Sequence, residues 1–233
     1  LLGAWPEVML RADASPNAFL HNLFMEHAMK ACAHVDVQPS LPVMVMLNGA
    51  DEGLYRSMPA KNSDWLMGLC GEEEVDIVDG PAANAVRGKD GSFLTLLAAL
   101  EGGSPLDTLE RLMDVRSLLD LACADLWTGR ADHDLNMRAW RPRTRNGRWR
   151  FILFDMDLWA PPDEHTIDRM CSETAPVSPW LPWLFGHAAM RDALLARMSA
   201  WLATSFAPDE ARHLADSLFQ ANEPLLRADH TRW

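Results

Sequence analysis

The chain has 233 residues, a formal net charge of -12, 48% hydrophobic residues and 23% charged residues. That length suffices for one domain, or two small ones, with a substantial core. The acidic excess argues against a general nucleic-acid binder or a protein held on anionic membranes, because both depend on lysine and arginine. No apolar stretch approaches the roughly 18 residues that span a bilayer, so no membrane span is expected. The chain opens on Leu1 with no visible signal peptide, which leaves its localisation unknown.

Hydrophobic periodicity and turn residues predict the elements. In chain order we expect a helix over 17–33, a hairpin of strands 42–47 and 53–55, a strand over 75–78, helices over 92–100, 105–113 and 114–127, a second hairpin with arms 137–142 and 148–155, and helices over 183–206 and 208–219. Asn48-Gly49 and Asn146-Gly147 supply the two turns, because this dipeptide tolerates the left-handed backbone of tight hairpins.

Three further expectations concern the ends and gaps of this layout. Asn17 follows a proline and is expected to cap the first helix. The strand 42–47 is expected to be buried, and the proline-rich stretch 160–182 is expected to form a flap. The fold class is therefore α+β, mostly helical with a central β-hairpin.

The second arm of the central hairpin ends in two acids, Asp155 and Asp157. If the strand stays extended, the two-residue period places both carboxylates on one face. Two like charges at the edge of an apolar strand are costly unless a cation neutralises them. Carboxylate oxygens suit Mg²⁺, which substrate phosphates often complete. The pair thus predicts a magnesium site, while acids that merely end a strand at the solvent would give the same pattern.

A polar loop over 130–136 leads into the first arm of this hairpin. A hairpin brings the residues before its first strand close to those after its second, so Asp132 and Asn136 should approach Asp155 and Asp157. Phosphoryl transfer uses such a set: one Asp acts on the attacking hydroxyl, while an Asn and a second Asp hold Mg²⁺ against the phosphates.

Six arginines fall within the thirteen residues 138–150. They are interpreted either as a solvated hairpin rim or as a docking surface for phosphate or an acidic substrate beside the site.

Several segments resemble the CotH kinase family, and they occur in the family's order. They are LRADASPNAFLHNLF (10–24), LNGADEGLY (47–55), VDIVDG (75–80), DVRSLLDLACADLWTGRADHDLNMRAW (114–140), GRWRFILFDMDLW (147–159) and RDALLARMSAWLATSFAPDEARHLADSL (191–218). The family carries an NGEYWGLY-like hairpin and a GKWRWxxFDLDFGF-like strand, and the second of these is the specific part of the match.

The resemblance implies an atypical protein-kinase-like fold over 1–233, with strands and a hairpin in 1–80, a helical catalytic part in 81–233, and a truncated N-terminal lobe. It implies Mg²⁺-dependent transfer of the γ-phosphate of ATP to a Ser or Thr of a protein substrate, often a secreted, cell-surface or spore-associated one. Neither nucleic acid nor a membrane span is implied.

Carried over residue by residue, the resemblance makes Asp132 the catalytic acid, with Asp134 as the alternative two residues on. Asn136, Asp155 and Asp157 become metal ligands. Arg11, within the segment that resembles the family's Leu-Arg-Asn motif, becomes a residue that binds the cofactor ATP.

Three positions depart from the family pattern. The family's Glu shortly after Gly-Leu-Tyr has no counterpart in 56–59, its Asn doublet is reduced to Asn136-Met137, and its Gly after the paired acids is Trp159. Two alternative functions therefore stay open: a degenerate kinase-like module for nucleotide binding or assembly, and a glycosyltransferase whose Asp-x-Asp motif holds a metal against a nucleotide sugar. The long helical middle disfavours the second, which needs alternating strands and helices before the motif.

Overall fold

A computed structural model of the chain describes residues 6–13, 15, 17–72, 74–80, 82–172 and 180–231. Its helices are α1 (Ala18–Cys32), α2 (Ser63–Cys70), α3 (Gly91–Glu101), α4 (Leu106–Leu112), α5 (Val115–Thr128), α6 (Thr166–Cys171), α7 (Trp180–Gly186), α8 (Ala188–Leu202) and α9 (Pro208–His230). Its strands are β1 (Val8–Arg11), β2 (Asp36–Val37), β3 (Leu41–Leu47), β4 (Ala50–Pro59), β5 (Val75–Asp79), β6 (Asn84–Arg87), β7 (Arg138–Pro142) and β8 (Arg150–Leu153). No described helix is both long and apolar enough to traverse a bilayer.

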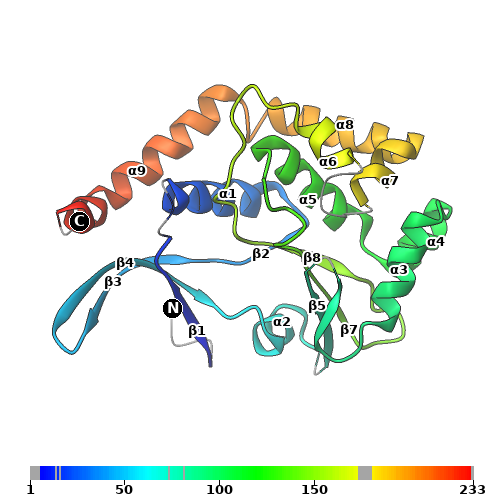
Figure 1. Cartoon of the computed structure of the whole chain (residues 1–233), viewed down its shortest axis with the longest axis horizontal. Helices are drawn as coiled ribbons and strands as arrows, with labels where there is room; N and C mark the ends of the chain where they lie inside the picture. The colour runs from blue at the N-terminus through cyan, green and yellow to red at the C-terminus, as the bar shows by residue number, and fades with distance from the viewer. Residues whose placement is uncertain are drawn as a thin grey trace.

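The strands form two sheets, which lie beneath a layer containing α1, α5, α8 and α9 (Figure 1). The first sheet is antiparallel with the order β1-β4-β3. The second has the order β2-β8-β7-β5-β6, with β2 parallel to β8 and the other neighbours antiparallel. Because β2 and β5 precede residue 80 and β7 and β8 follow it, the second sheet joins the two parts of the chain. The mixed helix-and-strand class and both hairpins are confirmed.

The first hairpin turns at Asn48 and Gly49, which both have positive φ, as an Asn-Gly turn requires. The prediction that β3 is buried was wrong: Met46 and Leu47 are 63% and 60% exposed. The hairpin lies below the helical layer in Figure 1, and although α9 contacts both of its strands, the end of β3 stays exposed. Its returning strand β4 is longer than predicted, because it also pairs with β1.

The helix ends show which local signals were reliable. Gly129 ends α5 in the left-handed conformation that favours glycine. Asn17 does not cap α1: its φ of 63° is left-handed, whereas a side-chain cap needs an extended residue, and no cap hydrogen bond forms. The short helix α2, capped by Asn62, was not predicted. Of the predicted flap, α6 is helical, and 173–179 lies outside the described residues.

Strand β8 is buried on both of its faces, which fixes where the chain leaves it. Phe151 and Leu153 belong to the main core, which includes residues of α1, α3, α5, α7 and α8. Ile152 points the other way, into a smaller cluster with Trp65 and Trp140. Full burial of each such side chain is worth about 1.5–3 kcal/mol, so the strand is held firmly in place.

Candidate active site

The paired acids lie in a bend of the chain that follows β8, and not on the extended strand itself. The strand ends at Leu153, and Asp155 has a φ of 56°. The two-residue period that was expected to align the carboxylates is therefore absent. They meet all the same, because a guanidinium nitrogen of Arg11 lies 2.5 Å from Asp155 and 3.6 Å from Asp157.

The electrostatics of this pair show that it needs positive charge. Burial and the neighbouring Asp155 both raise the pKa of Asp157, and Arg11 opposes them. Arg11 also contacts Asp13 at 3.0 Å, and Asp13 is in turn ion-paired to the buried Arg56. One flexible cation that is 37% exposed thus neutralises two crowded acids.

The polar loop after α5 lies against the segment that follows the paired acids. The amide of Ala131 donates to the carbonyl of Leu158 at 3.1 Å, so the two stretches run side by side. The side chain of Asn136 donates to a carboxylate oxygen of Asp132 at 2.5 Å. Burial raises the pKa of Asp132, with Arg130 opposing and Asp155 adding to the rise. Asp132 and Asp155 are therefore close enough for their charges to interact, while the predicted approach of Asn136 to Asp157 stays a prediction.

Asp134 is placed differently from Asp132. It is 1% exposed, and its carboxylate lies 3.2 Å from the ring of the equally buried His133. Burial, followed by the charge of Arg130, lowers the pKa of His133 to about 4, so this imidazole is neutral at pH 7. Asp134 is thus enclosed in the protein, whereas Asp132 is half-buried beside the acidic pair.

Arg130 connects the two acidic segments, a role that no sequence pattern indicated. Its guanidinium is fully buried and lies 2.9 Å from Asp125. It donates to the carbonyl oxygens of Phe154 at 3.0 Å and His133 at 3.3 Å, one in each segment. Burial raises the pKa of Asp125 to about 6, with Arg130 opposing. A glycine that ends a helix just before an arginine is too common a pattern to have indicated this role.

Two further cations lie at the end of the second sheet where β8 ends. Arg138 forms a two-pronged pair with Asp79 at 2.7 and 3.0 Å and donates to the carbonyl of Lys61 at 2.9 Å. The ammonium of Lys61 lies 4.0 Å from the ring centroid of Phe154, the residue before Asp155. Lys61 was not among the predicted site residues.

Three of the other arginines of the central hairpin are ion-paired to acids of neighbouring strands, while Arg145 and Arg148 are exposed near its turn. Arg141 and Arg143 are both paired to Asp76 on β5, and Arg150 is paired to Asp36 on β2. They lie toward the hairpin turn, and β8 runs away from that turn toward Asp155. Most of the arginine charge is therefore neutralised within the sheet, because the strands on either side of the hairpin supply the acids.

The donor set fits a hard divalent cation that also takes ligands from a substrate. Within the described residues no group of three or more His, Cys, Asp or Glu side chains is placed to hold a metal. Mg²⁺ in phosphate-transfer sites commonly uses only one or two carboxylates plus phosphate oxygens, and Asp155 and Asp157 supply two. The amide nitrogen of Asn136 is committed to Asp132, which leaves its carbonyl oxygen to act as a ligand.

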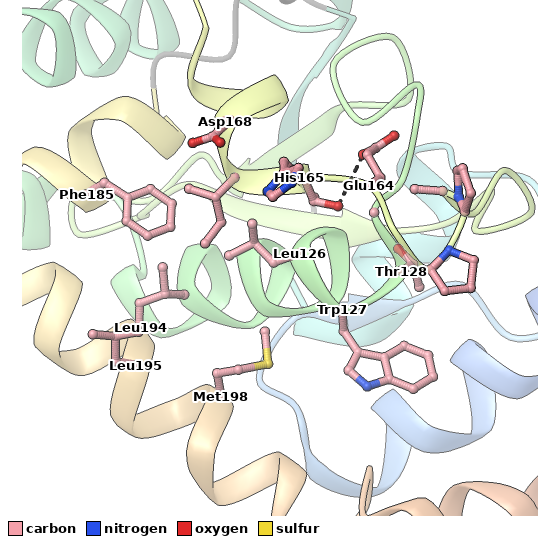
Figure 2. A pocket seen from close by; sticks show the side chains of 16 residues that line it. Leu126, Trp127, Thr128, Glu164, His165, Asp168, Phe185, Leu194, Leu195 and Met198 are labelled. Carbon is pink, nitrogen blue, oxygen red and sulfur yellow. Dashed lines mark hydrogen bonds between the residues drawn. The ribbon is translucent and has the colours of Figure 1, made fainter.

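A cavity elsewhere in the structure is separate from these acids. A cavity of about 640 Å³ lies between α5, α8 and the segment 160–168, with Leu126, Leu194 and Met198 on its walls (Figure 2). Asp132, Asp155 and Asp157 do not line it. Glu164, His165 and Asp168 also line it, but among the described residues they are not grouped to hold a metal.

Comparison with known proteins gives one match. The family model described as CotH kinase protein matches residues 2–233. Among curated proteins, no match was found.

Proposed function

The chain belongs to the CotH kinase family, and from that premise we propose that it transfers the γ-phosphate of ATP to a Ser or Thr hydroxyl of a protein in a Mg²⁺-dependent reaction, on an atypical protein-kinase-like fold. The observation that carries the proposal is the convergence of Asp155 and Asp157 on one cation, with Asp132 and Asn136 beside them. Two carboxylates, an amide and a separate acid are the parts that phosphoryl transfer uses.

In this proposal Asp155 and Asp157 hold the metal, and Asn136 adds its amide oxygen. Mg²⁺ bound there would neutralise charge on the phosphates. Arg11, which now neutralises both acids, would then be released to bind phosphate oxygens, for which its planar guanidinium is suited. The Asp13 carboxylate, held by Arg56, keeps Arg11 at the site.

Asp132 takes the role of the acid that orients the acceptor hydroxyl and accepts its proton. Its hydrogen bond from Asn136 fixes one carboxylate oxygen. The charge of Asp132 also interacts with that of Asp155, whereas Asp134 lies beside the buried His133. These features support Asp132 over Asp134.

One observation favours the alternative of a binding or assembly module without turnover. Arg11 already supplies a positive charge at 2.5 Å from Asp155, so the pair is partly neutralised by the chain itself. The glycosyltransferase alternative has less support, because the acids follow an antiparallel hairpin and not a strand of an alternating strand-helix sheet.

Calorimetry of ATP binding with and without Mg²⁺ tests the proposal. The parent should bind ATP only with the metal, and Asp155→Asn or Asp157→Asn should weaken that binding about tenfold or more, since hydrogen bonds and ligation by charged groups are worth 1.5–3 kcal/mol. Asp107→Asn, on the exposed face of α4, is the matched control and should bind as the parent does.

Two outcomes would reject the proposal. Stronger binding of a UDP- or GDP-sugar than of ATP would favour the glycosyltransferase. If no nucleotide gives a metal-dependent heat of binding, the assembly module is the alternative that is left.

A further inference from the structure

Lys61 is a cation held in a fixed position at the end of the second sheet. Its ammonium lies over the ring of Phe154, 4.0 Å from the centroid. That ring packs against the small apolar cluster that includes Trp65 and Trp140, so it is a rigid support. The next residue along the chain is Asp155. The ammonium is therefore placed beside the paired acids by an aromatic ring and not by a carboxylate.

The charge of Lys61 is less well compensated than that of its neighbours. Arg11 and Arg138 each lie within 3.0 Å of a carboxylate oxygen. Among the described residues, no carboxylate lies within ion-pair distance of Lys61. Burial, followed by the charge of Arg138, lowers the pKa of Lys61 to about 8, and the charges of Asp155 and Asp79 only partly offset these effects.

A half-buried ammonium in this situation is suited to bind an external anion. We propose that Lys61 binds phosphate oxygens of the nucleotide, from the side of the acidic pair where β4 leads into α2. This inference rests on the proposed function, because ATP is the source of the phosphate. A compact ammonium is a common phosphate ligand, and an anion would supply the counter-charge that the protein itself leaves out.

Amine labelling with peptide mapping provides an internal comparison, because the chain has only three lysines, Lys30, Lys61 and Lys89. Acylating reagents attack the neutral amine. At pH 8 a group with a pKa near 8 has a neutral fraction roughly 100-fold larger than an ordinary lysine. Lys61 should therefore react first. ATP with Mg²⁺ should protect Lys61, adenosine should not, and the labelling of Lys30 and Lys89 should be unaffected by either.

Binding measurements on variants complete the test. Lys61→Met should weaken ATP binding about tenfold or more and leave adenosine binding unchanged, while Lys61→Arg should stay within about threefold of the parent. Lys89→Met, at an exposed position, is the control. The inference is overturned if the parent binds ATP with Mg²⁺ but Lys61 is labelled equally with and without it, or if Lys61→Met binds ATP as the parent does. If the parent binds no ATP at all, the proposed function fails first, and the inference falls with it.

Discussion

Removing the Arg130 guanidinium should destabilise the protein in a way that depends on pH. Arg130→Met keeps much of the side-chain volume but leaves Asp125 buried without its partner at 2.9 Å. Breaking a fully buried ion pair by removing one member costs about 3–5 kcal/mol. The carbonyl oxygens of Phe154 and His133 lose a donor as well. We expect a loss in the upper part of that range at pH 8.

The pH dependence follows from the sign of the pKa shift. In the folded parent the pKa of Asp125 is raised to about 6, above its ordinary value of 3.8, so ionising it costs stability as pH rises through 6. Without Arg130 the folded pKa rises further. Between pH 6 and that new value, the folded variant holds a proton on Asp125 that the folded parent and the unfolded chains do not hold. The variant's loss of unfolding free energy relative to the parent therefore shrinks as pH falls. This loss should shrink by about 1.4 kcal/mol per pH unit, or at most roughly 2.7 kcal/mol between pH 8 and pH 6.

Urea unfolding followed by tryptophan fluorescence at pH 6, 7 and 8 measures this. Arg111→Met is the control, because Arg111 forms an exposed pair on α4 and should cost no more than about 0.5 kcal/mol at any of these pH values. The double variant Asp125→Asn with Arg130→Met should lose the pH dependence. A loss below about 1 kcal/mol for Arg130→Met, or a loss that is equal at pH 6 and pH 8, would refute the reasoning.

Two other substitutions test how the loops are held. Gly129→Ala should destabilise the fold by about 1–3 kcal/mol in thermal unfolding, because φ is +61° and an added Cβ would lie 2.5 Å from the Cβ of Ala160. Gly68→Ala, in open space on α2, is the control and should leave stability unchanged or raise it. Equal effects of the two substitutions would contradict this reasoning. Trp159→Ala should cost about 2–4 kcal/mol, since the indole stacks on His21 with centroids 4.0 Å apart and donates to the carbonyl of Met156 at 2.8 Å. Trp159→Phe should recover most of that loss, and a Phe variant as unstable as the Ala variant would show that stacking is not the cause.

Local sequence signals predicted the elements well where the signal is itself local. Asn48-Gly49 located the first hairpin, and Gly129 located the end of α5. Asn146-Gly147 does lie between β7 and β8, but neither residue has the positive φ that was expected of its turn. The closeness of Asp132 and Asp155 also followed from chain connectivity, because a hairpin returns to where it began. These conclusions need no knowledge of what the rest of the chain does.

The features that were missed depend on contacts between distant segments. The bend at Asp155, where φ is 56°, is not indicated by any residue pattern in 148–157. The roles of Arg130 and Lys61 depend on Phe154, which lies far from both along the chain: its carbonyl accepts from Arg130, and its ring lies beneath the Lys61 ammonium. The ion pairs of Arg141, Arg143 and Arg150 could not be predicted either, because the acids that pair with them lie on β2 and β5.

Transfer of labelled γ-phosphate is the most direct test of the proposed kinase activity. The parent, given ATP and Mg²⁺, should label itself or an acidic, serine-rich test protein. Asp132→Asn should reduce the rate about 100-fold or more while ATP affinity changes little, because a group that acts on the acceptor hydroxyl is needed mainly in the transition state. Asp134→Asn, altered in the enclosed pair with His133, should transfer phosphate if it folds as the parent does. A parent that binds ATP with Mg²⁺ yet transfers no phosphate would contradict the proposed function. An Asp132→Asn variant that transfers phosphate at the parent rate would contradict the role of Asp132 in it.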